Sequence, residues 1–217
     1  KKKIKYYSIP YKKLKKKNQI KQLVNFFKKK KINGIIHLST YYTAEHQENQ
    51  VDDLITGNIK FGIFILEAAK QSNIKWIINI GTKYQNMKGY AYSPVNLYSS
   101  LKEAFENIGK FYEETYNIIF TTLRISHVGG YGDRRDKIFN LLRNKKKNSS
   151  ILINAPNQLM EIFHVKDVIN AILKLINSIK QKKKLKTLYF LNSKNIIAVK
   201  DLVNLYNWIS GKNITIV

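Results

Sequence analysis

Short apolar runs alternate with longer amphipathic segments along most of the chain. The apolar runs predict strands at 34–40, 76–82, 118–126, 151–155 and 187–192. Segments with apolar residues at three- and four-residue intervals, or on most sides, predict helices at 58–70, 94–116, 137–146, 163–179 and 199–212. A short extended entry should precede the helix at 163–179. This alternation predicts an α/β fold with a mainly parallel sheet.

Three of the predicted strands end in small or polar residues. These ends are His-Leu-Ser-Thr at 37–40, Asn-Ile-Gly-Thr at 79–82 and Arg-Ile-Ser-His-Val-Gly-Gly at 124–130. In open parallel sheets, ligands bind beyond the carboxyl ends of the strands. We therefore expect a ligand site where these three segments converge.

Tyr98 and Lys102 lie four positions apart within the helix predicted at 94–116. Two other Tyr-x-x-x-Lys pairs occur in the chain, which has 14 tyrosines and 39 lysines and arginines, so the spacing alone does not identify a site. Only this pair combines a helix, which places both side chains on one face, with a preceding strand that ends in Thr82. The alternative is a surface Tyr and Lys on an amphipathic helix.

The chemistry of these three residue types suits proton transfer. A phenol with a pKa near 10 is a poor acid or base at neutral pH, and an ammonium one helical turn away lowers that pKa. The hydroxyl of Thr82 could hold a substrate oxygen against the Tyr98 hydroxyl. Hydride transfer to or from a nicotinamide would complete an oxidation or reduction at one carbinol carbon.

Composition excludes several classes of protein. The 217 residues are 44% hydrophobic and have no cysteine, which fits a globular chain without disulfides or thiolate zinc sites. The four histidines form no ligand-spaced cluster, so we predict no metal. No apolar run approaches the roughly 18–20 residues of a membrane span, so we expect no membrane partner. The lack of cysteine suits a reducing cytoplasm, and we expect a cytoplasmic protein.

The formal net charge of +25 raises the question of a polyanionic partner. The lysines occur in short runs at expected helix ends and loops, namely 12–17, 28–31, 145–147 and 182–184. Such runs usually form solvated faces, and a positive field would also attract a small anionic substrate. We therefore expect no nucleic-acid partner.

Five segments in order resemble the extended short-chain dehydrogenases/reductases that act on nucleotide-diphosphate sugars, the NAD-dependent epimerase/dehydratase family. The resemblance extends from about Gly34 to Leu202. The matching segments are GIIHLST, NIKFGIFILEAAKQSNIKWIINIGT, SPVNLYSSLKEAFE, TLRISHVGGYGDRRDK and FHVKDVINAI. The resemblance implies a Rossmann-like, doubly wound parallel sheet with a small carboxyl-terminal substrate-binding lobe.

The resemblance assigns roles to the three candidate catalytic residues. It implies that Tyr98 is the general acid/base, that Lys102 tunes the pKa of Tyr98 and contacts the nicotinamide ribose, and that Thr82 orients the substrate. It also implies a cofactor, NAD or NADP, which would lie against Leu38, Ser39 and Thr40 with Asn58 nearby.

The resemblance also indicates substrate-binding residues. His127 replaces the Asn that approaches the sugar nucleotide in the family, and Arg134 and Arg135 could bind the diphosphate, because guanidinium matches phosphate oxygens bidentately. A solvated charged loop is the alternative for the two arginines. His164 has a family counterpart, but we expect it to be a packed structural histidine.

The family's glycine-rich phosphate loop has no counterpart among the ten glycines. We therefore expect a partial chain from which the first βαβ segment is missing. We assign 1–128 to a partial Rossmann-like cofactor-binding domain. We assign 129–217 to a mixed region with substrate-binding lobe elements, of which one strand and helix return to the main domain.

The residues after Thr82 narrow the expected reaction. Dehydratases of the family carry an acidic pair directly after the catalytic Thr, whereas this chain has Lys83, Tyr84 and Gln85. We therefore expect an NAD(P)-dependent 4-ketosugar reductase of the kind that handles CDP-linked deoxysugars, acting as a homodimer on a nucleotide-diphosphate sugar. The alternatives are a 4-epimerase of the same family and a non-catalytic basic polyanion-binding protein.

Overall fold

The computed structural model describes residues 7, 9, 17–89, 91–133, 135, 137–194 and 196–217. The chain forms two compact units, one of residues 1–123 with 186–189 and the other of residues 124–185 with 190–217. Within the described residues, no helix is long and apolar enough to cross a membrane.

The first unit is built on a four-stranded sheet. Its strands are β1 (Gly34–His37), β2 (Trp76–Thr82), β3 (Ile119–Ile125) and β7 (Leu188–Phe190), in the order β1-β2-β3-β7, and the last residues of β3 and β7 belong to the second unit. β1 and β2 run parallel, with Gly34 opposite Trp76 and His37 opposite Asn79. The predicted α/β fold with a parallel sheet is confirmed.

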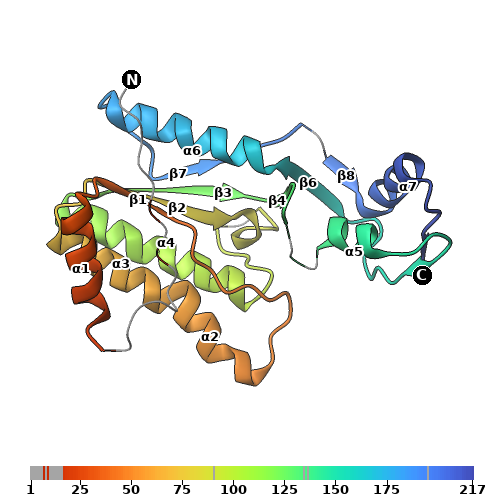
Figure 1. Cartoon of the computed structure of the whole chain (residues 1–217), viewed down its shortest axis with the longest axis horizontal. Coiled ribbons are helices and arrows are strands. Elements are labelled where there is room, and N and C mark those ends of the chain that lie inside the picture. The colour runs from red at the N-terminus through yellow and green to blue at the C-terminus, as the bar shows by residue number, and fades with distance from the viewer. Residues whose placement is uncertain are drawn as a thin grey trace. The chain divides into compact units, whose positions relative to one another are not determined.

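Three helices lie on one face of this sheet (Figure 1). They are α1 (Gln19–Lys30), α3 (Phe61–Gln71) and α4 (Leu97–Tyr116). Their apolar sides and the strands form one core, which includes Leu23, Phe27, Leu66, Ile77, Phe105 and Phe120. α3 continues a helical run that starts with α2 (Val51–Ile55) and passes through a π-helical turn, η3 (Thr56–Lys60).

Two glycines allow aromatic rings to enter this core. A Cβ atom at Gly62 in α3 would lie 2.2 Å from the Phe105 ring, and a Cβ atom at Gly109 in α4 would lie 2.0 Å from the Phe120 ring. Both rings are almost completely buried. The glycines therefore let α4 approach both α3 and β3 closely.

The second unit contains two small sheets. β4 (His127–Gly129), β6 (Leu159–His164) and β8 (Ile196–Ala198) form one sheet, in which β6 is parallel to β4 and antiparallel to β8. β5 (Ser150–Ile151) pairs in parallel with β9 (Thr215–Ile216). The helices of this unit are α5 (Ile138–Asn144), α6 (Val165–Lys180) and α7 (Val199–Ser210). Its buried apolar residues include Leu142, Ile151, Met160, Leu202, Val203 and Ile214.

Several expected boundaries differ from the structure. β2 has the predicted bounds, but the long helix begins at Leu97 rather than at 94, because the Asn96 side chain accepts a hydrogen bond from the Ser99 N–H and caps the helix. The extended entry before α6 is the full strand β6. The pattern of apolar runs also missed α1, β4, β8 and β9. The strands are too short for a recognisable pattern, and lysines hide the amphipathic pattern of α1.

We expect Gly109→Ala to destabilise the protein. Alanine favours a helix interior by about 1 kcal/mol over glycine, but overpacking a buried ring costs about 1–3 kcal/mol or more. The Phe120 ring has no exposed surface into which it could move. The clash should therefore dominate, and thermal unfolding should show a lower Tm. Thr115→Ala, at an exposed site on the same helix, should leave Tm nearly unchanged; an equal Tm for both variants would contradict the close packing of α4 on β3.

Candidate active site

The carboxyl end of β2 and the first turns of α4 carry the three candidate catalytic residues. Thr82 is the last residue of β2 and is buried, whereas Tyr98 and Lys102 lie one helical turn apart on α4. α4 packs against β2 and against η4 (Lys83–Gln85), the short helical turn that follows Thr82. The structure thus brings the strand end and the helix together, as the sequence predicts.

Lys102 is an unusually buried lysine. Only 4% of its surface is exposed, and burial lowers the pKa of its ammonium group to about 8. A positive charge in such a poorly solvated position interacts strongly with a nearby phenolate, because little water screens the attraction. The burial of Lys102 therefore suits a residue that lowers the pKa of a neighbouring tyrosine.

His37, at the end of β1, lies beside Lys102. Burial, together with the positive charge of Lys102, lowers the pKa of His37 to about 3, so the imidazole is neutral at physiological pH. Its ring packs 4.9 Å from the Phe105 ring, measured between centroids. Its Nε2 atom has no hydrogen-bond partner among the described residues. His37 thus adds no positive charge to the surroundings of Lys102.

Thr82 is held through both its backbone and its side chain. Its N–H donates to Oε1 of Gln85 at 2.8 Å, and its Oγ1 accepts from the N–H of Tyr84 at 3.3 Å. The second bond uses a lone pair of the hydroxyl oxygen, so the hydroxyl hydrogen can still be donated to a substrate. The role of Thr82 in orienting a substrate oxygen stays a prediction.

Tyr98 is half-buried and has an aromatic neighbour. The ring of Tyr42 meets it edge-on, with the ring centroids 5.0 Å apart. Tyr42 lies in the loop after β1 and is half exposed. This loop thus reaches the candidate acid/base from the β1 side.

The predicted cofactor-binding residues meet around Asn58. The Asn58 side chain is buried, accepts from Oγ1 of Thr40 at 2.8 Å, and donates to the carbonyl oxygens of Tyr41 at 2.8 Å and Leu54 at 3.0 Å. These bonds fasten the loop after β1 to the π-helical turn η3, and π-helical turns often occur at functional sites. On this loop, Leu38 is exposed and Ser39 is half-buried. The structure brings these residues together, and their contact with a cofactor stays a prediction.

Two of the predicted substrate residues, His127 and Arg135, lie in the second unit. Burial, and then the charge of Lys137, lowers the pKa of His127 to about 4, so His127 is neutral. Arg135 donates to both carboxylate oxygens of Asp133, at 2.8 and 2.6 Å, and to the carbonyl oxygen of Val128 at 2.9 Å. These bonds lower the pKa of Asp133 to about 2. Arg135 is thus paired with Asp133, and its contact with a diphosphate stays a prediction.

A cavity of about 210 Å³ lies beside Arg135, lined mainly by residues 128–133, at the end of β4 and in the loop after it, and by Val165. Arg134 lies outside the described residues.

The prediction that His164 is a packed histidine is wrong, since its side chain is exposed and its Nδ1 accepts from the N–H of Lys166 at 3.2 Å. His164 precedes the first residue of α6, and through this bond its side chain caps the helix.

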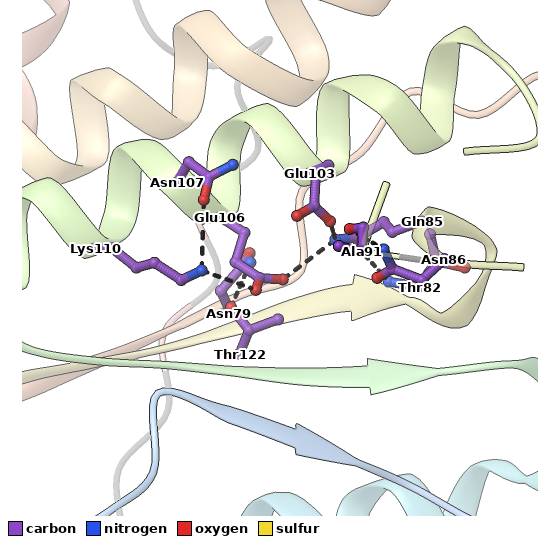
Figure 2. A network of polar contacts seen from close by, with 10 residues as sticks. All are labelled: Asn79, Thr82, Gln85, Asn86, Ala91, Glu103, Glu106, Asn107, Lys110 and Thr122. Atoms are coloured by element: carbon purple, nitrogen blue, oxygen red, sulfur yellow. Dashed lines mark hydrogen bonds and ion pairs between the residues drawn. The ribbon is translucent and has the colours of Figure 1, made fainter. Parts of the chain in front are cut away.

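Sequence reasoning missed the buried polar residues behind Thr82. Gln85 and Glu106 have no exposed surface, and Gln85 is bonded to both Glu106 and Glu103 (Figure 2). The signal available in the sequence was the position of the two glutamates, one and four residues after Lys102 on the same helix. That spacing places them near the active-site turn, but it does not show that they are buried.

Residues 13–189 match the model of the NAD dependent epimerase/dehydratase family. The chain is 27% identical over 150 residues to CDP-abequose synthase of Salmonella typhimurium, covering 68% of this chain and 49% of that protein. It is 28% identical over 148 residues to CDP-abequose synthase of Yersinia pseudotuberculosis, covering 66% and 51%. The chain thus spans about half the length of these curated relatives.

Solved structures with the same fold include two sugar-nucleotide epimerases. UDP-glucuronic acid 4-epimerase from Bacillus cereus, in complex with UDP-glucuronic acid and NAD, superposes with a TM-score of 0.74 at 20% identity, covering 90% of this chain and 64% of that one. UDP-glucose 4-epimerase from Thermotoga maritima, with UDP-glucose, superposes with a TM-score of 0.75 at 17% identity, covering 91% and 68%. At these identities the likeness shows a shared Rossmann-like fold.

The burial of Lys102 predicts a specific pH dependence of stability. Its folded-state pKa of about 8 lies below its ordinary value of 10.5, so the unfolded chain binds more protons between these pH values. Lys102 therefore destabilises the fold most below about pH 8, and this penalty disappears as the pH rises towards 10.5. Lys102→Met should raise the free energy of unfolding at pH 7 and much less at pH 10.

Urea titrations of both proteins, without added nucleotide, measure this difference. Lys174→Met, a substitution outside the candidate site, serves as the control. Its free energy of unfolding relative to wild type should not change comparably with pH. A stabilisation by Lys102→Met that is equal at pH 7 and pH 10 would contradict the lowered pKa.

Proposed function

The chain belongs to the NAD dependent epimerase/dehydratase family, and from this we propose that it is an NAD(P)-dependent 4-ketosugar reductase acting on a nucleotide-diphosphate sugar. The observation that carries the proposal is the buried Lys102, one helical turn after Tyr98, on a helix packed against the strand end at Thr82. This arrangement suits proton transfer to a carbonyl oxygen that becomes a hydroxyl.

Each of the three residues has one task in this mechanism. The Thr82 hydroxyl donates a hydrogen bond to the sugar oxygen and holds it beside the Tyr98 hydroxyl. Tyr98 gives its proton to that oxygen as negative charge develops there. The Lys102 ammonium, poorly screened by water, stabilises the resulting phenolate. The same groups run the reaction in reverse when a sugar hydroxyl is oxidised.

The residues near β1 fit the nicotinamide end of a dinucleotide. Leu38 and Ser39 follow the strand, Asn58 fixes their loop, and Lys102 supplies an ammonium that can bind ribose hydroxyls. When bound, NAD or NADP supplies the hydride chemistry of the reaction. The protein's own contribution is to hold the sugar oxygen at Tyr98 and to keep water away from Lys102.

The surroundings of Thr82 favour reduction over dehydration. Lys83 and Tyr84 follow Thr82 at the positions where the family's dehydratases, which eliminate water, carry an acidic pair. The carboxylates near this turn, Glu103 and Glu106, come from α4 and are bonded to Gln85. Both carboxylates thus accept hydrogen bonds from the last residue of η4.

The relatives support a CDP-linked sugar as the substrate. Both curated relatives are named for CDP-abequose. A 4-epimerase of UDP-linked sugars is the second candidate, and the two epimerase structures with the same fold favour it. The reactions differ in cofactor balance, because a reductase consumes one NAD(P)H per product and an epimerase consumes none.

We expect Tyr98→Phe to lower kcat by about 10²–10⁴-fold, as loss of a general acid does. The purified protein is mixed with CDP- or UDP-linked 4-ketosugars and NADH or NADPH, and the nicotinamide absorbance is followed. Tyr116→Phe, at the far end of the same helix, should keep the wild-type rate. Unchanged turnover in Tyr98→Phe with the fold intact would remove Tyr98 from the mechanism.

The ketosugar assay, together with the same measurement on UDP-glucose, separates the two candidate reactions. A decrease in absorbance that is stoichiometric with the reduced sugar supports the reductase. Interconversion of UDP-glucose and UDP-galactose without net change in absorbance would support the epimerase and contradict the reductase.

A further inference from the structure

We propose that Gln85 is a positioning residue that fixes the active-site Thr82 relative to the helix segment that carries Lys102. The inference rests on the proposed function, because it assigns to Gln85 a part in the catalysis by Thr82, Tyr98 and Lys102. It begins from the buried polar network behind the turn η4, drawn in Figure 2.

The Gln85 side chain joins two parts of the first unit. Its Oε1 accepts from the N–H of Thr82 at 2.8 Å, while its Nε2 donates to Oε2 of Glu103 at 2.7 Å and to Oε2 of Glu106 at 3.2 Å. Gln85 and Glu106 have no exposed surface. One amide group therefore connects the end of β2 to two side chains of α4.

The chemistry of these partners admits only one orientation of the amide. Carboxylates accept hydrogen bonds, and the Thr82 N–H can only donate. If the amide turned over, its NH₂ group would face the Thr82 N–H, and its oxygen would face Glu103 and Glu106. Both contacts would then be repulsive between groups with little or no exposed surface, so Gln85 holds the turn in one position.

The two carboxylates lie on α4 close in sequence to Lys102. Glu103 is adjacent to Lys102, and Glu106 lies one helical turn further along α4. Lys110 lies with its Nζ 3.7 Å from Oε1 of Glu106 and compensates that buried carboxylate. The link thus joins the Thr82 backbone to the part of the helix that carries Lys102.

The alternative is that Gln85 only stabilises the fold. The two roles make different predictions for kinetics, because a stabilising contact changes the amount of folded protein and a positioning contact changes the rate of the folded protein. A displacement of about 1 Å at a reacting group can cost on the order of a hundredfold in rate. The distinction therefore depends on kcat measured for protein shown to be folded.

The test uses Gln85→Met and Gln85→Glu in the ketosugar assay. Gln85→Met removes all three hydrogen bonds at similar size, and we expect kcat to fall about 10–100-fold with KM nearly unchanged. Thr121→Val is the control, since it removes a different hydrogen bond in the same unit, from the buried Thr121 hydroxyl to the Lys186 carbonyl oxygen. It should lower Tm and leave kcat unchanged.

Gln85→Glu gives a pH-dependent version of the same contact. When the introduced carboxyl group is protonated, it donates one hydrogen bond to a carboxylate and still accepts from the Thr82 N–H. When it is ionised, it faces Glu103 and Glu106 as a third negative charge. Burial and like charge raise the pKa of this introduced carboxyl, and the positive Lys110 opposes only part of that rise. The folded state then binds the extra proton more tightly than the unfolded state.

Both kcat and Tm of Gln85→Glu, each relative to wild type, should therefore be highest near about pH 5 and fall towards about pH 8. This result, with the kcat loss of Gln85→Met, supports the positioning role. Wild-type kcat in folded Gln85→Met, or kcat ratios for Gln85→Glu that do not change with pH, would overturn it while leaving the proposed function intact. If the wild type turns over neither CDP- nor UDP-linked sugars, the proposed function fails first, and the positioning role falls with it.

Discussion

The close packing of α4 against the sheet is the constraint on which the candidate active site depends. Tyr98 and Lys102 are carried by this helix, and Thr82 is carried by β2, so their relative position depends on how the helix and the strand meet. Gly109 allows the Phe120 ring to fill the space beneath α4, and Phe105 anchors the helix between α3 and β3. The apolar core thus sets the coarse distance, and hydrogen bonds at the end of β2 set the finer position.

The electrostatics near the site differ from those of the chain as a whole. The chain carries a formal charge of +25, yet the interior around Lys102 contains a neutral histidine and, further along α4, the buried carboxylate of Glu106. Lys102 therefore has a neutral imidazole, and not a second cation, at the end of β1. The scattered surface lysines act at longer range and are screened by salt, so they affect the approach of an anionic substrate more than the reaction itself.

The sequence predicted the framework of the first unit well because its apolar runs are long and regular. β2 was predicted with its observed bounds, and the pairing of Tyr98 with Lys102 on one helix followed from the three- and four-residue periodicity of α4. The buried position of Gln85 could not be predicted, because it arises from contacts with Glu103 and Glu106 in another element. Local pattern also missed short strands such as β8, whose pairing with β6 is a long-range interaction.

The π-helical turn around Asn58 changes which side of the helix each residue faces along the run from Val51 to Gln71. An α-helix turns by about 100° per residue. One widened turn therefore rotates the residues before it, relative to those after it, by about the angle of one residue. A single helical wheel drawn through α2 and α3 would therefore place Leu54 on the wrong side. Removal of one residue from η3 would restore a regular α-helix and rotate α2 away from the loop that Asn58 holds, which makes the length of this segment as important as its composition.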